Sequence, residues 1–253
     1  MQESDFWDGR DLGPAGSGSR LNESRVLGPF RFVVMGPPGS GKRMQAALLE
    51  ERLGAQLLTP AETELLAEVC ASGDRDARLD RRKSTRKGKN TAFTDLVHAQ
   101  DDEAPSWLRA DTGFTLEGFP RTIDEAGAFI GLLRAAHIDL TAVLYYELSV
   151  DWAISRLANS RRCRDCGAVS PARRWPERQA AVCDHCGGVM RRSAREEPQR
   201  VRERFVRYEL DAAPVLDYFA DLGVLLTIEA EGCPEEVFQR TEFKLSNVLP
   251  AMD

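Results

Sequence analysis

The stretch GPPGSGKRMQ (residues 36–45) decides the fold of this chain. It follows the apolar run FRFVVMG (30–36), which reads as a buried strand, and leads into MQAALLEERLG (44–54), whose apolar residues recur at helical spacing. A glycine-rich turn between a strand and a helix lets backbone N–H groups surround an anion, and the helix N-terminus adds partial positive charge. The stretch therefore predicts a phosphate-binding loop in which Lys42 reaches the terminal phosphates of a nucleotide. The alternative is a glycine-rich turn without a ligand.

The residues after the loop lysine depart from the commonest pattern. A phosphate loop of the common type has Ser or Thr directly after the lysine, whereas this chain has Arg43 and then Met44. A hydroxyl is missing and a positive charge is added at an anion-binding helix end, yet the glycine cradle is complete. The predicted nucleotide contacts of the loop are Gly36, Pro38, Gly39, Ser40, Gly41, Lys42, Arg43 and Met44.

Strand and helix patterns alternate along the rest of the chain. Further short strands are expected at residues 55–59, 114–120, 141–150 and 224–230. Helix starts are marked by Thr59 with Glu62, by the segment TIDE (122–125), whose helix runs to about residue 136, and by Pro234. Such alternation predicts an α/β fold of the P-loop NTPase type, a parallel five-stranded sheet with helices on both faces.

Composition narrows the class of protein. The chain has 253 residues, 42% of them hydrophobic, and a formal net charge of −6, so the total charge does not call for nucleic acid as a partner. No apolar run is long enough to span a bilayer, and the N-terminus lacks the apolar centre of a signal peptide. We therefore expect a cytoplasmic protein without a membrane partner, preceded by a flexible tail over residues 1–29 that is polar and rich in Gly and Ser.

Four of the six cysteines form two regularly spaced pairs. CRDC (163–166) and CDHC (183–186) each place two residues between their cysteines. Four thiolates at this spacing suit a tetrahedral Zn²⁺ that has no open position for water, which makes the ion structural. The sequence predicts Cys163, Cys166, Cys183 and Cys186 as zinc ligands. The alternatives are a pair of disulfides or a site that has been lost.

A third signal is LEGFPRT (116–122). Glu117 ends a predicted strand beside the expected position of the phosphate loop, and a carboxylate there can hold Mg²⁺ through water. Arg121 lies just past the turn that follows. Alone this pattern is common at strand–helix junctions.

Together with VRERF (201–205), these stretches resemble adenylate kinase and the wider nucleoside monophosphate kinase family, over about residues 30–242. The resemblance implies Mg²⁺-dependent transfer of a phosphoryl group from ATP to a nucleoside monophosphate, AMP foremost, by a monomer. It also implies three parts: a core, a helical insertion that takes the monophosphate, and a zinc-stapled lid. Their expected bounds are 30–58, 92–158 and 197–245 for the core, 59–91 for the monophosphate-binding insertion, and 159–196 for the lid.

The family resemblance also implies a ring of cations around the transferred phosphoryl group. Lys42, Arg121, Arg156 and Arg204 match its members, and Arg161 stands one residue from another, whose own place is taken by Ser160. Other places fail to match. Leu66 stands where the insertion's arginine is expected, and Glu125 where a base-reading glutamine is expected. Ser193, beside Arg192, stands where the arginine before the family's Asp-Asp pair is expected. Arg43-Met44 replaces the family's Gly-Thr.

These losses leave three hypotheses open. The first is an active, divergent nucleoside monophosphate kinase. The second is a nucleotide-binding homologue with impaired catalysis and a regulatory or scaffold role. The third is a zinc-ribbon protein that binds nucleic acid through basic runs such as RRKSTRKGK (81–89), a run that is otherwise a solvated face or a substitute for the lost arginine.

Overall fold

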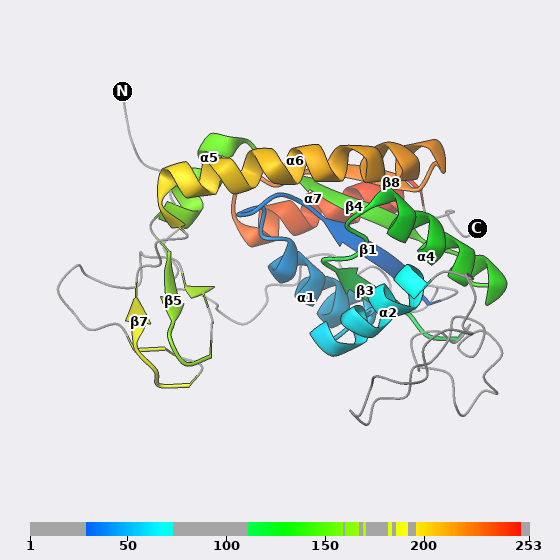
Figure 1. The fold of residues 1–253 in the computed structure, drawn as a ribbon, viewed down its shortest axis with the longest axis horizontal. Helices are drawn as coiled ribbons and strands as arrows, with labels where there is room; N and C mark the ends of the chain where they lie inside the picture. Colours follow the sequence, from blue (N-terminus) through cyan, green and yellow to red (C-terminus); the bar gives the residue numbers. More distant parts are fainter. Residues whose placement is uncertain are drawn as a thin grey trace.

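A parallel five-stranded sheet forms the centre of the molecule (Figure 1). The computed structural model describes residues 29–72, 111–158, 160–166, 169–170, 182–183, 186–191 and 196–248. The strand order is β2-β3-β1-β4-β8, and every neighbouring pair in the sheet is parallel. The strands are β1 (Arg31–Met35), β2 (Gln56–Leu57), β3 (Phe114–Glu117), β4 (Ala142–Glu147) and β8 (Leu225–Glu229). The predicted fold class is confirmed.

Six helices of the described chain surround the sheet. They are α1 (Lys42–Leu53), α2 (Pro60–Ser72), α4 (Ile123–Ala135), α5 (Val150–Ala158), α6 (Pro198–Asp221) and α7 (Pro234–Ser246). Figure 1 shows α6 running along one side of the core from the neighbourhood of α5. A separate three-stranded antiparallel sheet, with order β6-β5-β7, lies beyond the α5 end of α6. Its strands are β5 (Arg161–Cys163), β6 (Val169–Ser170) and β7 (Met190–Arg191).

The sheet is buried on both faces because successive strand residues point to opposite sides. On β1, Val33 and Met35 pack in a cluster with residues of α2, α4 and the second half of α6. Phe32 and Val34 pack in the other cluster, with residues of α1, α5, α7 and the first half of α6. This arrangement places the carboxyl ends of the strands, where ligands bind in such folds, at one open edge.

Several local expectations were right and some were wrong. Thr59 and Glu62 form the predicted capping contacts, since Thr59 N donates to Glu62 Oε2 at 2.7 Å. The strand expected over 141–150 is too long: it ends at Glu147, and α5 begins at Val150, where the Ser149 hydroxyl accepts a hydrogen bond from Trp152 N. Helix α5 and the three-stranded sheet were not among the predicted elements.

The TIDE capping box forms only in part. Glu125 N donates to the Thr122 hydroxyl at 3.2 Å, as predicted, but the Glu125 carboxylate accepts from Arg121 N at 2.6 Å and not from the amide of the capping residue. Glu125 therefore holds the turn that carries Arg121.

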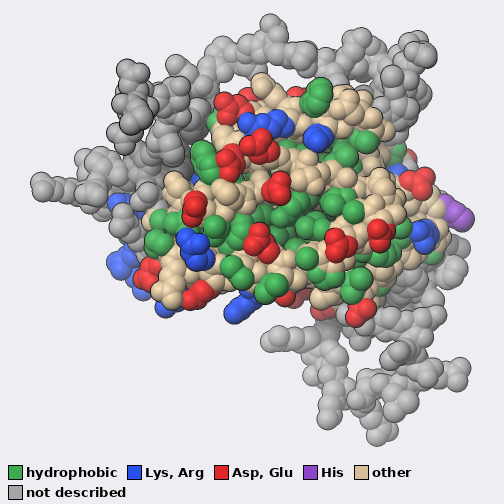
Figure 2. Space-filling model, turned by 90° about the horizontal axis from the view of Figure 1, so that it is seen from above, with side chains coloured by type: hydrophobic (Ala, Val, Ile, Leu, Met, Phe, Trp, Pro, Cys, Tyr) green, Lys and Arg blue, Asp and Glu red, His purple; other side chains and the backbone are tan. Residues whose placement is uncertain are grey.

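Several predicted features lie outside the described residues. They are the tail (1–28 of the expected 1–29), most of the monophosphate-binding insertion (73–91), the basic run (81–89), Arg192 and Ser193. Among the helices that the structure does describe, none combines the length and the apolar character that a membrane span requires. Figure 2 looks onto the side of the molecule where α6 lies, and there acidic and basic side chains are interspersed among apolar ones.

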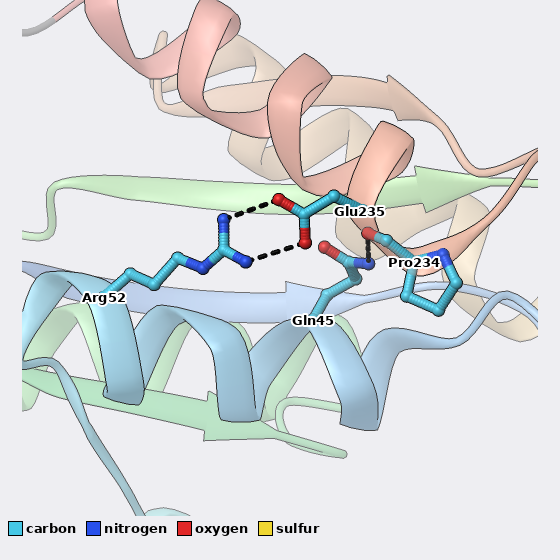
Figure 3. A network of polar contacts seen from close by, with 4 residues as sticks. All are labelled: Gln45, Arg52, Pro234 and Glu235. Carbon is cyan, nitrogen blue, oxygen red and sulfur yellow. Dashed lines mark hydrogen bonds and ion pairs between the residues drawn. The ribbon is translucent and has the colours of Figure 1, made fainter. Parts of the chain in front are cut away.

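Helices α1 and α7 are joined by a polar clasp (Figure 3). The Arg52 guanidinium donates to both carboxylate oxygens of Glu235, at 2.9 and 2.7 Å. About two turns earlier in α1, the buried Gln45 side chain donates to the backbone oxygen of Pro234 at 2.8 Å. The clasp fixes the phosphate-loop helix against the last helix of the core.

We expect the Arg52–Glu235 pair to contribute about 0.5–1 kcal/mol near neutral pH, because both side chains are partly exposed to water. The hydrogen bond from Arg52 lowers the pKa of Glu235. A carboxyl group whose pKa is lower in the folded state stabilises the fold above its unfolded pKa of about 4.3, and that contribution is lost as the pH falls through the folded pKa. A double-mutant cycle with Arg52→Met and Glu235→Gln, measured by urea unfolding at several pH values, checks this. A coupling energy that stays constant into the acid range contradicts it.

Candidate functional site

The phosphate loop joins β1 to α1 and is shaped by its glycines. A Cβ atom at Gly36 would lie 2.6 Å from the Ser40 hydroxyl oxygen and 2.8 Å from the backbone oxygen of Tyr146, so no side chain fits there. Gly39 and Gly41 have φ angles of 88° and 80°, a region that favours glycine. Gly41 is the N-cap of α1, and its oxygen accepts from Met44 N and Gln45 N. The loop therefore has the backbone geometry that the sequence predicted.

Two side chains from distant parts of the chain hold this loop. The Tyr208 hydroxyl, on α6, accepts a hydrogen bond from Gly36 N at 2.7 Å. The Arg156 guanidinium, on α5, donates to Gly39 O at 3.1 Å and to the backbone oxygens of Ala230 and Gly232 at 2.7 Å each. Arg156 thus links the loop to the turn that follows β8.

Lys42 occupies the first position of α1 and is partly buried. Burial lowers the pKa of its ammonium group, and the nearby Glu117 carboxylate acts in the opposite direction. A bound phosphate brings more negative charge to the same place and favours the protonated lysine. Lys42 and Glu117 therefore lie together at the carboxyl edge of the sheet, as the sequence predicted.

A cavity of about 700 Å³ adjoins the loop. It lies between the start of α1, the end of β3 and the first two turns of α2, and its volume is within the usual range for sites of small organic ligands. Its lining residues are Arg43, Glu50, Leu57, Leu58, Thr59, Pro60, Thr63, Glu64, Ala67, Glu117, Gly118, Phe119 and Arg121. The cavity shares Glu117 with the neighbourhood of Lys42, so the two sites are contiguous.

Arg121 is oriented at the wall of this cavity by backbone contacts. Its Nε donates to Gly118 O at 2.9 Å, and its own backbone amide is held by Glu125. Leu66, in contrast, is fully buried in the core beside Cys70 and Phe114. In the sequence, Leu66 recurs with Leu65, Val69 and Cys70 at helical spacing, and this apolar stripe explains its burial. The position therefore supplies no cation to the cavity.

The remaining predicted cations lie near the three-stranded sheet. Arg204, on α6, donates to the Glu196 carboxylate at 3.1 Å, and Arg162 lies 3.9 Å from the same buried carboxylate. Arg161 is at the start of β5 and half-buried, whereas Ser160 is buried. Glu196 therefore fixes Arg204 where α6 leaves this sheet.

The four clustered cysteines come together as predicted. Their sulfur atoms all lie within 4.8 Å of one another, with Cys163 and Cys186 Sγ 3.4 Å apart and Cys166 and Cys183 Sγ 3.7 Å apart. Four thiolates at about 2.3 Å from one tetrahedral Zn²⁺ lie about 3.8 Å from one another. The donor set and its spacing fit a zinc ion, and the thiols are free and not joined as disulfides.

Tyr208 is the site residue that the sequence reading missed. It lies four residues after Arg204 and so on the same face of α6, which was a usable signal for a contact near the site. A tyrosine hydroxyl can equally face water on a protein surface, however. Gly36, whose backbone amide donates to Tyr208, is 172 residues away in the chain. Only the folded chain identifies that contact.

Comparison with known proteins gives consistent matches over most of the chain. Residues 34–224 match the sequence model of the family described as adenylate kinase. The chain is 32% identical to an adenylate kinase of Streptomyces avermitilis over 213 residues, which cover 83% of this chain and 94% of that protein. It is also 32% identical to an adenylate kinase of Carboxydothermus hydrogenoformans, with 83% and 96% covered, and 28% identical to one of Archaeoglobus fulgidus, with 87% and 99% covered.

Proposed function

Because the chain belongs to the adenylate kinase family, we propose that it transfers the terminal phosphoryl group of ATP to a nucleoside monophosphate, with AMP as the preferred acceptor. The observation that carries the proposal is that two sites adjoin each other. One is the phosphate loop with Lys42, and the other is the cavity of about 700 Å³; Glu117 lines the cavity and interacts with Lys42. A donor triphosphate in the loop and an acceptor in the cavity then face each other. Phosphoryl transfer depends on such positioning.

In the proposed reaction, an oxygen of the acceptor's phosphate attacks the terminal phosphorus of ATP. The new P–O bond forms as the bond from that phosphorus to the bridging oxygen breaks, and ADP leaves with the electron pair. No covalent intermediate with the protein is needed. Lys42 offsets the negative charge on the transferred group, and the backbone N–H groups of residues 36–42 hold the neighbouring phosphates.

Arginines complete the proposed site from both sides. Arg121 binds the acceptor's phosphate at the cavity wall, where Gly118 and Glu125 orient it. Arg156 lies against the loop itself, within 3.1 Å of Gly39 O. We propose that Arg204 and Arg161 approach the triphosphate from the three-stranded sheet, which acts as a lid over the donor.

Two metal ions belong to the proposal. Mg²⁺ accompanies ATP and neutralises its phosphates, and the Glu117 carboxylate, beside Lys42, suits it through bound water. The four-cysteine cluster suits a structural Zn²⁺ in the lid. We propose that the chain acts as a monomer, and that it is cytoplasmic because its clustered cysteines are spaced for a metal and are not joined as disulfides.

A second candidate function follows from a particular observation. The core position of Leu66 and the engagement of Glu125 by Arg121 N remove two expected acceptor contacts. These losses favour a homologue that binds a nucleoside triphosphate and transfers nothing, with a regulatory or scaffold role.

A coupled assay of ADP formation separates the two candidates. The full chain is incubated with Mg²⁺ and ATP, together with AMP, GMP, CMP, UMP or dTMP in turn. The proposal expects ADP formation above the rate with ATP alone, fastest with AMP, and two ADP molecules for each AMP consumed. Binding of a triphosphate by calorimetry, with no turnover for any of the five acceptors, supports the second candidate and overturns the first.

A further inference from the structure

The acceptor cavity has an unexpected cation on its wall. Arg43 is the second residue of α1, and it lines the cavity together with Glu50, seven residues later on the same face of the helix. Arg43 and Arg121 are the two cationic side chains among the described lining residues. Helix α2 contributes Pro60, Thr63, Glu64 and Ala67 to the wall, and none of these is basic.

Both arginines have hydrogen-bond donors to spare. Arg121 uses Nε on Gly118 O, and no described residue pairs with its two terminal nitrogens. Arg43 is exposed and forms no hydrogen bond or ion pair with any residue that the structure describes. Three acidic side chains line the cavity, and none of them forms an ion pair with Arg43 or Arg121 among the described contacts: Glu50 accepts a hydrogen bond from Leu57 N at 3.0 Å, Glu117 interacts with Lys42, and Glu64 lies on the α2 wall.

Arg43 is also close to the donor site. It directly follows Lys42 in the first turn of α1, and its positive charge adds to burial, the larger cause, in lowering the pKa of Lys42. An anion held by Arg43 and Arg121 would lie in the cavity whose wall includes Glu117, the carboxylate that interacts with Lys42. A phosphate monoester, with close to two negative charges at neutral pH, is the anion that gains most from two guanidinium groups.

We propose that Arg43 binds the phosphate of the acceptor nucleotide and supplies, from the first turn of α1, the cation that α2 lacks at Leu66. This inference rests on the proposed phosphoryl transfer and names a binding residue for it. Arg43 and Arg121 hold the acceptor phosphate from two sides, and the oxygen left between them points to the transferred phosphoryl group. Arg43, which departs from the family's pattern after the loop lysine, is then part of the acceptor site.

The test compares Arg43→Gln and Arg43→Lys with the unchanged chain. Losing a charge-assisted contact of this kind costs about 10- to 100-fold in affinity. Arg43→Gln should therefore raise KM for AMP by about 10- to 100-fold and change KM for ATP by less than about threefold, and Arg43→Lys should recover part of the loss. Arg134→Gln, at an exposed position of α4, is the matched control and should leave both KM values unchanged.

Direct binding keeps this test separate from that of the reaction itself. Equilibrium dialysis with radiolabelled AMP, without ATP, measures the acceptor site whether or not turnover occurs. Weaker AMP binding by Arg43→Gln than by Arg134→Gln supports the inference even if the chain shows no turnover. The absence of turnover overturns only the proposed reaction. Equal AMP binding and equal KM for AMP in all variants overturn the role of Arg43 and leave the proposed reaction intact. An unchanged chain that binds no monophosphate overturns the inference as well.

Discussion

Replacing Lys42 by methionine should lower kcat for phosphoryl transfer by about 10²- to 10³-fold, the usual effect of removing one preorganised charge from a transition state. Methionine keeps the length of the side chain and removes its charge. The backbone N–H groups of the loop remain, so binding of ATP should weaken far less than kcat falls. Steady-state kinetics with ATP and AMP, together with calorimetric titration of ATP, measure the two effects separately.

The same variant should not unfold the protein. Burial lowers the pKa of Lys42, which means that the folded state disfavours its charged form. Removing that charge therefore leaves the melting temperature unchanged or raises it. Lys244→Met, at an exposed position of α7, is the matched control and should retain full activity. A Lys42→Met protein with normal kcat and normal KM for ATP would place the transferred phosphate elsewhere.

Replacing Cys166 by serine should remove the metal from the three-stranded sheet. Three thiolates and a hydroxyl are a much poorer tetrahedral site than four thiolates, and metal binding at structural zinc sites contributes about 10–16 kcal/mol in isolated zinc-finger peptides. After both proteins are dialysed against the same chelator, we expect about one zinc per unchanged chain and almost none per Cys166→Ser chain. Elemental mass spectrometry gives the zinc content, and limited proteolysis should show faster cleavage within residues 160–191.

The control for this variant is Cys233→Ser. Cys233 lies at the N-terminus of α7, far from the cluster in sequence, and serine is a favoured residue at that helix position. It should keep its zinc and its stability. Calorimetric binding of ATP should be preserved in both variants, because the phosphate loop belongs to the core. A reduced, folded, unmodified chain that takes up no zinc would contradict the assignment of the four cysteines.

Local chemistry made much of the fold predictable. The loop at 36–42 needs only its glycines and its place between a strand and a helix, and the helix starts at Thr59 and Pro234 involve residues within four positions. The error at Ser149 has a physical reason as well. The apolar run continues through Leu148 and Val150, and only the hydroxyl of Ser149, which accepts from Trp152 N, ends the strand pattern and starts α5.

Long-range contacts explain what the sequence could not give. Arg156 was predicted as a member of the ring of cations, yet its guanidinium donates to three backbone oxygens, all of them more than 70 residues away. The position of Arg43 on the wall of the cavity depends on how α1 packs against β3. Leu66, in contrast, could be placed from the sequence, because the apolar stripe of its helix already indicated that it packs in the core.

The glycines of the phosphate loop also bear on how such a protein can diverge. Gly36 is closed to other residues by Ser40 and the backbone of Tyr146, and Gly39 by its φ angle and the backbone of Ala153. Apart from the Ser40 side chain, these obstacles belong to the backbone, which neighbouring mutations cannot easily move. Arg43 and Met44 are exposed, so they can change one at a time. In the proposed reaction, single substitutions in α1 of a duplicated copy can therefore change the acceptor while the phosphate loop stays the same.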